Sequence, residues 1–400
     1  MNIAVAQSGG PTCAINASLV GVFKEALKTP EIDAVFGSIN GIEGIINDEL
    51  MDLKLVIKTN EDMELLRQTP STVLGSCRFK LPPAEEGGEI YQRINNCFEK
   101  HRIEAFFYIG GNDSMDTVAK LSDYFASIGS PIKVIGIPKT IDNDLPVTDH
   151  TPGFGSAAKY VAATVQEIIR DSSVYSIESV TIIEIMGRHA GWLTASTCVL
   201  RANDEIAPHL IYLPESKFSA EKFLEDVRSQ QAKYKAVVVA VSEGVKIEGE
   251  RSKPVMVDNF GHEYLSGIGK TLEQLVKDNI GCKVRSIELN VMQRCSSHIC
   301  SKTDIDEAEL IGSSGVKAAL SGETGKMMCY KRISSQPYVI TIDSVDAHET
   351  ANKEKFFPKK WINDAQNDIK PAAVDYFLPL IQGEVKIAMN NGMPVHFKLK

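Results

Sequence analysis

The stretch VIGIPKTIDNDLPVTDHTPGFGSAAKY, residues 134–160, decides the fold prediction. Its apolar start, 134–137, predicts a buried strand, and the amphipathic pattern after Ser156 predicts a helix. The loop between them carries Asp142 and Asp144. Because open parallel sheets of α/β proteins bind ligands beyond the carboxyl ends of their strands, we expect this acidic loop to belong to a binding site.

A second corner of the same kind lies just upstream. The apolar segment 105–109 predicts a strand, which runs into GGNDS at 110–114 and then into a helical pattern. Glycine lets a ligand approach the backbone closely, and the free N–H groups of a helix N-terminus attract anions. The two corners together favour phosphoryl transfer as the chemistry.

The N-terminal segment contains a weaker signal of this type. In SGGPT, Gly9 and Gly10 could bring backbone N–H groups to phosphate oxygens, or they could simply make a tight turn. Arg78 and Lys80, in a loop rich in turn formers, could likewise bind a phosphate or remain surface cations.

Apolar strand patterns alternate with helical patterns along the rest of the chain. The alternation predicts an α/β fold whose mostly parallel sheets are covered on both faces by helices. A length of 400 residues favours two domains, and TPGFG at 151–155 is the best candidate boundary. Strands are expected over 2–7, 34–39, 105–109, 134–137, 180–185, 209–213, 236–241 and 283–288, with a terminal pair over 326–332 and 338–344. Helices are expected over 13–27, 89–100, 114–126 and 156–170, from about Ile305 behind a Thr/Asp cap, and around PAAVDYFLPLI near the C-terminus. Loops are expected over 40–48, 70–88 and 245–263, and the polar composition of 245–263 suits a lid or a subunit-contact segment.

Polar residues also follow the later strands. Arg188 and His189 come after 180–185, and Glu243 comes after 236–241. Arg188 is a candidate phosphate ligand, whereas His189 is more typical of a rim or structural histidine. Arg285 and Arg294 flank the loop after 283–288 and could grip one phosphate between them.

Composition limits the class of partner. With 43 basic and 52 acidic residues the net charge is -9, which disfavours nucleic-acid and anionic-membrane partners. We find no apolar run of membrane-spanning length and no signal-peptide pattern at MNIAVAQSGG. Eight scattered cysteines suit a reducing compartment, so we expect a cytoplasmic protein. A zinc site at Cys295, His298 and Cys300 is an alternative that lacks a second cysteine pair.

Seven short motifs occur in a fixed order between residues 8 and 294: SGG, LGSCRF, GGNDS, PKTIDND, MGR, SEG and QR. This ordered set resembles the phosphofructokinase family, and its pyrophosphate-dependent branch most closely. The resemblance implies two Rossmann-like three-layer domains with the active site in the cleft between them. It divides the chain into a donor domain, residues 1–153 and about 294–355, and a sugar-phosphate domain, residues 154–293 and about 356–400. It also implies a homodimer or homotetramer.

Two residues, Asp113 and Lys139, carry the resemblance to the pyrophosphate-dependent branch. ATP-using relatives commonly have glycine at both positions. An aspartate would repel and obstruct a nucleotide triphosphate, and a lysine would stabilise transfer from the shorter diphosphate. The implied reaction is reversible, Mg²⁺-dependent transfer between pyrophosphate and the 1-hydroxyl of fructose 6-phosphate. The alternatives are an ATP-dependent sugar-phosphate kinase of the same fold and a non-catalytic regulatory subunit, which intact Asp142 and Asp144 disfavour.

The resemblance also implies a role for each site residue. Asp142 would be the general base, and Asp144 would orient it or help to hold magnesium. Asn112 would lie at the metal, where many relatives have aspartate; Ser179 and Val291 stand where bacterial ATP-using relatives have arginine and histidine. The donor would contact Gly10, Arg78 and Ser114 beside the catalytic Asp113 and Lys139; fructose 6-phosphate would contact Thr140, Ile141, Asp142, Met186, Gly187, Arg188, Glu243, Arg294 and, across a subunit interface, Arg285.

Overall fold

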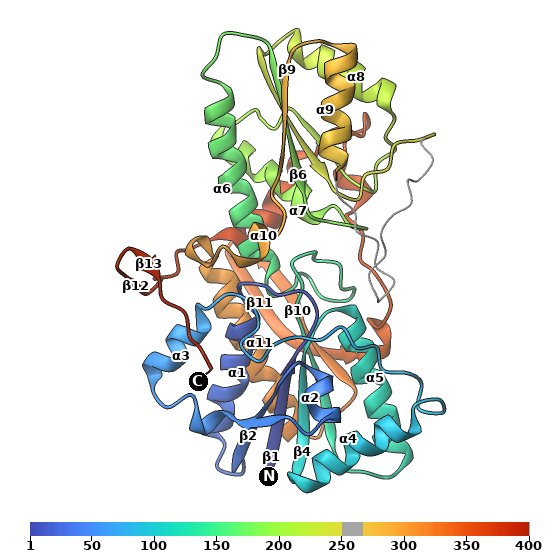
Figure 1. Ribbon diagram of the computed structural model, residues 1–400, viewed down its shortest axis with the longest axis vertical. Coiled ribbons are helices and arrows are strands. Elements are labelled where there is room, and N and C mark those ends of the chain that lie inside the picture. Colours follow the sequence, from blue (N-terminus) through green and yellow to red (C-terminus); the bar gives the residue numbers. More distant parts are fainter. Residues whose placement is uncertain (250–266, 400) are drawn as a thin grey trace.

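A seven-stranded sheet forms the base of the molecule, in the order β11-β10-β5-β4-β1-β2-β3 (Figure 1). The computed structural model describes residues 1–249 and 267–399. The central strands are parallel, while the outer strands β3 and β11 are antiparallel to their neighbours. The strands are β1 (Asn2–Gln7), β2 (Ala34–Ser38), β3 (Leu50–Asp52), β4 (Ile103–Gly110), β5 (Lys133–Pro138), β10 (Lys326–Ser335) and β11 (Tyr338–Asp346).

Helices cover both faces of this sheet. One face packs against α1 (Ile15–Lys28), α3 (Asn60–Arg67) and α11 (Lys302–Leu320), and the other against α2 (Ile42–Ile46), α4 (Gly88–Lys100) and α5 (Asn112–Ser127). Helices α1 and α11 touch through glycines, because a Cβ on Gly21 would lie 2.0 Å from the Glu309 carbonyl oxygen. The sheet and these helices are called the larger unit below.

A second sheet of four parallel strands, ordered β7-β8-β6-β9, lies above the first (Figure 1). One face packs against α6 and α7 and the other against α8 and α9; this is the smaller unit. Its strands are β6 (Ser179–Ile185), β7 (Leu210–Tyr212), β8 (Ala236–Ser242) and β9 (Lys283–Glu288). Its helices are α6 (Phe154–Ser172), α7 (Trp192–Ala195), α8 (Ala220–Gln231), α9 (Ile268–Asn279) and the short α10 (Met292–Cys295).

Helix α6 joins the two units at its first turn. Asp304, on α11 of the larger unit, accepts hydrogen bonds from the backbone N–H of Gly153 at 2.8 Å and of Ser156 at 3.0 Å. Gly153 has a φ of 103°, which favours glycine at this position. A carboxylate at a helix N-terminus satisfies unpaired N–H groups and complements the helix dipole. The direction of α6 is therefore set by a residue of the other unit.

The predicted α/β class with mostly parallel sheets is confirmed, and several local predictions are wrong. The segment 40–48 contains the short helix α2, and α3 was not expected. Helix α11 begins at Lys302, and its cap is Ser301, whose side chain accepts from the Asp304 N–H. Of the segment 245–263, residues 250–263 lie outside the described residues.

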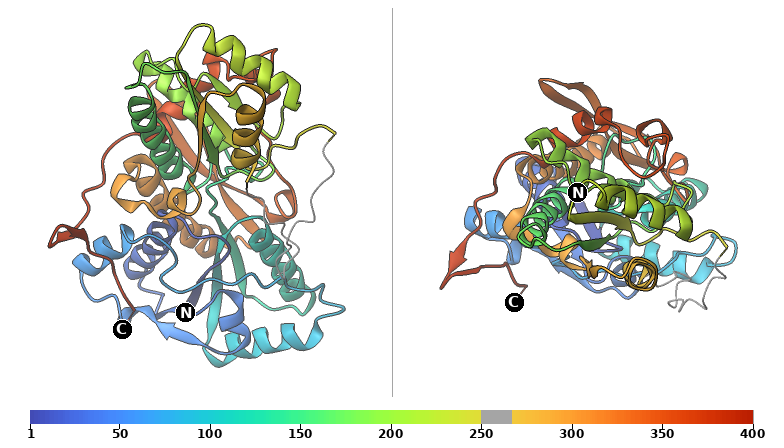
Figure 2. Two further views of the ribbon diagram at one scale, coloured as in Figure 1. Left: turned by 45° about the horizontal axis from the view of Figure 1, so that its top comes forward. Right: turned by 90° about the horizontal axis from the view of Figure 1, so that it is seen from above.

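The predicted C-terminal helix is present only in part. The segment forms one helical turn, α12 (Val374–Phe377), between 3₁₀ turns η6 (Pro371–Ala373) and η7 (Leu378–Ile381), because proline lacks an N–H donor. The chain then makes a small projecting hairpin, β12 (Met389–Asn390) and β13 (Met393–Pro394), and Phe397 packs into the core of the larger unit (Figure 2). The other 3₁₀ turns are η1 (Leu53–Leu55), η2 (Ser196–Asn203), η3 (Ser297–Ile299), η4 (Ala347–Glu349) and η5 (Lys359–Trp361). No helix in the described ranges is both long and apolar enough to cross a membrane.

Candidate active site

A cavity of about 910 Å³ lies where loops of the two units meet. Strands β5, β4 and β1 are parallel neighbours in the larger sheet, so the loops at their carboxyl ends share one edge. Loops after β6 and β8 of the smaller unit face them across the cavity. The predicted site residues that line it are Gly10, Arg78, Asn112, Asp113, Ser114, Lys139, Thr140, Ile141, Asp142, Asp144, Met186, Arg188, Glu243 and Arg294.

The loop after β5 and the turn after β1 meet through Lys139. Its ammonium donates a hydrogen bond to the Gly10 carbonyl oxygen at 2.6 Å. Gly9 has a φ of 74°, and a Cβ built there would lie 3.2 Å from the same ammonium. Burial lowers the pKa of Lys139 to about 8, against the opposing effect of Asp142 and Asp144. A cation is thereby held at the glycine turn, as anion binding requires.

The corner after β4 presents the start of helix α5. Its first residue, Asn112, has a buried side-chain oxygen for which the described residues supply no hydrogen-bond partner. Asp113 follows in the first turn and is exposed to the cavity. The helix N-terminus attracts anions, whereas the Asp113 carboxylate adds a negative charge directly beside it. This corner therefore combines a helix end that attracts anions with a carboxylate that repels excess negative charge.

The acidic loop after β5 holds two carboxylates at the cavity. The Asp142 backbone N–H donates to the Thr140 hydroxyl oxygen at 3.1 Å. Burial raises the pKa of Asp142, and Arg188, Lys139 and Arg294 oppose that rise. Burial and the neighbouring Asp142 raise the pKa of Asp144 to about 7. One carboxylate of the pair is thus surrounded by cations and the other is close to protonation at neutral pH.

Asn143 anchors this loop between the two aspartates. It is fully buried, with a φ of 54°, and its amide donates to the Tyr376 hydroxyl at 2.9 Å. The left-handed conformation is one that asparagine adopts more readily than most residues. The inward turn of Asn143 leaves its two neighbours directed to the cavity.

Loops after β6 and β8 make the wall of the smaller unit. Glu243 accepts a hydrogen bond from the Gly187 N–H at 3.4 Å, and burial raises the pKa of Glu243 to about 7. A Cβ on Gly244 would lie 1.8 Å from the Arg188 carbonyl oxygen, so only glycine lets the two loops cross here. Gly187 itself does not line the cavity, but it positions Glu243.

The two predicted phosphate-binding arginines separate. Arg294 lines the cavity, and its Nε atom is buried without a partner among the described residues. Arg285 lies on β9, pairs with Asp171 at 3.2 Å and does not line the cavity of its own chain. Arg285 and Arg294 of a single chain are therefore not placed to bind the same phosphate, as the sequence had suggested.

The segment after β11 contributes three lining residues that were not predicted from the sequence: Asn352, Glu354 and Phe356. They belong to the segment after β11, which has no periodicity or motif that predicts a site. His189, expected at a rim, does line the cavity, and its Nδ1 atom pairs with Glu354 at 2.6 Å.

Oxygen ligands for a divalent cation are present in the cavity. The unpartnered Asn112 side-chain oxygen and the carboxylates of Asp142 and Asp144 are the donors that Mg²⁺ prefers, and so fit such an ion. Over residues 1–249 and 267–399, the one cluster of three side chains with metal-ligand spacing is Asp48, Cys97 and His101, outside the cavity lining. The zinc alternative at Cys295, His298 and Cys300 gains no support.

Known proteins resemble the chain over its whole length. The phosphofructokinase family model matches residues 2–317. Pyrophosphate–fructose 6-phosphate 1-phosphotransferases of Halomonas elongata and Xanthomonas campestris pv. campestris are 38% and 39% identical, over 100% of this chain and 96% of each relative. The crystal structure of a pyrophosphate-dependent phosphofructokinase from Marinobacter aquaeolei matches with a TM-score of 0.89 and 38% identity, covering 100% of this chain and 96% of that one. Fold, motif order and full-length similarity agree that the chain belongs to the phosphofructokinase family.

Proposed function

We propose that this protein is a pyrophosphate-dependent phosphofructokinase. It transfers a phosphoryl group reversibly between pyrophosphate and the 1-hydroxyl of fructose 6-phosphate, giving fructose 1,6-bisphosphate and phosphate. The observation that carries the choice of donor is the joint presence of Asp113 and Lys139 at the cavity, with the Lys139 ammonium 2.6 Å from the Gly10 carbonyl oxygen. The names of the full-length relatives support the same reaction.

On the donor side, cations and a helix N-terminus favour a small anion. Lys139 would neutralise charge on the transferred phosphoryl group, where fixed cations stabilise the transition state most. Gly10, Arg78 and Ser114 line the same part of the cavity and would hold the diphosphate. Asp113 would exclude a nucleotide triphosphate by charge and by volume.

On the acceptor side, Asp142 would act as general base. The 1-hydroxyl oxygen bonds to phosphorus, the bond from phosphorus to the departing phosphate breaks, and the hydroxyl proton passes to the Asp142 carboxylate. In the reverse direction Asp142 returns that proton. Burial makes the carboxylate more basic, while Arg188, Lys139 and Arg294 favour its ionised form, as a base at neutral pH requires.

The remaining lining residues would bind the sugar phosphate. Glu243 can accept hydrogen bonds from sugar hydroxyls, and Arg188 and Arg294 can pair with the phosphate. Thr140, Ile141, Met186 and Gly187 would shape the same end of the site.

A divalent cation, which we propose to be Mg²⁺, would bind at the Asn112 side-chain oxygen and the carboxylates of Asp142 and Asp144. Bound there, it would neutralise the charge of the phosphate oxygens. Protein ligands are few because Mg²⁺ keeps several waters and is held largely by substrate phosphates.

We propose that the larger unit is the donor domain and the smaller unit the sugar-phosphate domain. The division 1–153 with about 294–355, and 154–293 with about 356–400, follows the two sheets. The packing of Phe397 into the larger unit favours assigning the last residues to the donor domain.

A homodimer or homotetramer that uses β9 would complete the site. β9 is an edge strand of the smaller sheet, and Val174, Tyr175 and Ile177 are exposed beside it, with Lys283 over the Tyr175 ring at 4.6 Å. Edge strands with apolar neighbours are suited to pairing with another chain. Arg285 would then reach the sugar phosphate bound to the partner.

The scattered cysteines, none in a disulfide, support a cytoplasmic location.

The test is formation of fructose 1,6-bisphosphate from fructose 6-phosphate and Mg²⁺, with pyrophosphate in one reaction and ATP in the other. We expect product with pyrophosphate alone. Product with ATP alone would refute the donor assignment, and product with neither would refute the acceptor.

A further inference from the structure

A short segment, residues 352–357, crosses from one unit to the other beside the cavity; we call it the strap. Asn352 donates to the Asp116 carboxylate on α5 at 2.9 Å. Glu354 pairs with His189, and the Phe357 N–H donates to the Glu215 carboxylate at 2.7 Å. The strap is therefore attached to the larger unit at one end and to the smaller unit at the other.

Lys355, in the middle of the strap, is attached to the acidic loop. Its ammonium donates to the Asn143 side-chain oxygen at 3.2 Å, the Thr148 carbonyl at 3.1 Å and the Asp149 carbonyl at 2.9 Å. An ammonium has three donors, so this loop uses all of them. The Lys355 backbone N–H adds a bond to the Asp144 carbonyl at 2.6 Å.

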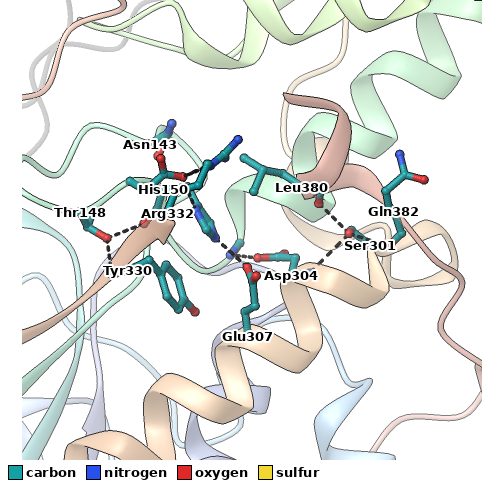
Figure 3. A network of polar contacts seen from close by, with 12 residues as sticks. Asn143, Thr148, His150, Ser301, Asp304, Glu307, Tyr330, Arg332, Leu380 and Gln382 are labelled. Atoms are coloured by element: carbon teal, nitrogen blue, oxygen red, sulfur yellow. Dashed lines mark hydrogen bonds and ion pairs between the residues drawn. The ribbon is translucent and has the colours of Figure 1, made fainter. Parts of the chain in front are cut away.

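These bonds join the two ends of the loop that carries Asp142 and Asp144. Its far end is held independently, because Asp149 pairs with Arg332 at 2.8 Å and with His150 at 2.9 Å. His150 also contacts Glu307 of α11 at 2.7 Å and stacks on Tyr330 (Figure 3). Lys355 thus links the near end of the loop, at Asn143, to an anchored buried network.

Trp192 fixes Lys355 from the smaller unit. The indole N–H donates to the Lys355 carbonyl at 2.9 Å, and the ammonium lies 5.0 Å from the ring centroid. The side chain of Lys355 does not line the cavity, although Asn352, Glu354 and Phe356 of the same strap do. Its effect on a bound substrate must therefore pass through the loop.

We propose that Lys355 is a positioning residue, which fixes the loop bearing Asp142 in the geometry for proton and phosphoryl transfer and couples that geometry to both units. This inference rests on the proposed function. Small displacements of a reacting group cost rate more than substrate affinity, so Lys355 should act on kcat rather than on KM.

The test compares Lys355→Met with Lys355→Arg and with the matched control Lys353→Met. Lys353 is exposed, lies two residues away in the strap and does not line the cavity. We expect Lys355→Met to lower kcat by about 10- to 100-fold with both KM values within about threefold of the parent. Lys355→Arg, which keeps the charge and the donors, should restore part of kcat, and Lys353→Met should match the parent.

Amide hydrogen exchange of the peptide 141–150 gives a readout that does not depend on activity. Exchange should be faster in Lys355→Met and unchanged in Lys353→Met. A folded Lys355→Met protein with parental kcat and parental exchange overturns the inference. If Lys355→Met does not fold, kcat is compared between Lys355→Gln and Lys355→Arg. Equal kcat in these two variants would also overturn the inference. Absence of pyrophosphate-dependent turnover in the parent would refute the proposed function alone, and the exchange result would still test the positioning.

Discussion

The ammonium of Lys139 lies 2.6 Å from the carbonyl oxygen of Gly10, although β4 separates the strands that precede these two residues. The contact spans 129 positions of the chain and joins the loop after β5 to the glycine turn after β1. A buried lysine keeps its charge less easily than an exposed one, so the state of this contact depends on pH.

The first prediction concerns the alkaline limb of the pH–rate profile. Burial lowers the pKa of Lys139 to about 8, so the ammonium is present below that pH and lost above it. We expect kcat/KM for pyrophosphate to fall as pH rises through about 8. Lys139→Arg should shift this fall to higher pH whatever its absolute rate, because guanidinium stays charged. The control Lys133→Arg, at the start of the same strand, should leave the pH of this fall unchanged. If Lys139→Arg also leaves it unchanged, Lys139 is not the group whose deprotonation lowers kcat/KM.

Replacing the proposed base should remove turnover but keep binding. Asp142→Asn preserves the shape of the side chain and cannot accept the proton. We expect kcat to fall by about 10²- to 10⁴-fold, with the dissociation constant of fructose 6-phosphate changed far less. Steady-state kinetics measures kcat, and calorimetric titration measures the dissociation constant of fructose 6-phosphate. The control is Asp375→Asn, at an exposed position of α12, which should keep the parental kcat. A near-parental kcat in Asp142→Asn would exclude Asp142 as the base.

Donor choice can be tested at the start of α5. Asp113→Gly removes a carboxylate that faces the cavity, and should strengthen ATP binding by about tenfold or more, since juxtaposed like charges cost several kcal/mol. Asp113→Asn keeps the volume and removes the charge, so it separates the two contributions. Calorimetric titration with ATP is the measurement. Equal, weak ATP binding by the parent and both variants would contradict exclusion by Asp113.

A mixed dimer tests whether Arg285 acts across a subunit interface. Asp142→Asn and Arg285→Ala should each be inactive alone. If Arg285 serves the partner's site, a mixed dimer has one site with both residues intact, and co-expression in equal amounts should restore about a quarter of parental activity. Recovery is measured on the co-purified mixture. Activity no higher than that of the two single variants would place Arg285 outside the partner's site.

Buried His150 should make stability depend on pH. Burial alone lowers the pKa of His150, but hydrogen bonds to Asp149 and Glu307 outweigh it, and the pKa is raised above 6.5. The stabilisation by the imidazolium is therefore complete below pH 6.5 and is lost as pH rises through the raised value. His150→Gln should destabilise by about 3–5 kcal/mol at pH 6 and by less at pH 9.

Urea unfolding at the two pH values measures this difference. His396→Gln, at an exposed histidine, should leave the midpoint unchanged at both. An equal loss for His150→Gln at pH 6 and pH 9 would show that the charged form contributes nothing.

Much of the fold could be predicted because its signals are local. Apolar strands and amphipathic helices repeat with periods that a short window reveals, and parallel strands bring their carboxyl ends to one edge. The corners at Gly10, Asn112 and Asp142 follow from that rule, and each lies within one strand–loop–helix segment. Short helices such as α2 and α7 were not predicted, because so few residues show no periodicity.

The tertiary structure alone decided which distant segments complete the site. The Lys139–Gly10 contact, the arrival of Glu354 at the cavity and the attachment of Lys355 to the acidic loop join residues far apart in sequence. It also directed Arg285 outward, away from Arg294. The chemistry of each loop was determined by its own residues. The cavity they share was determined by packing, because the positions of neighbouring strands and the path of the strap depend on the burial of whole units.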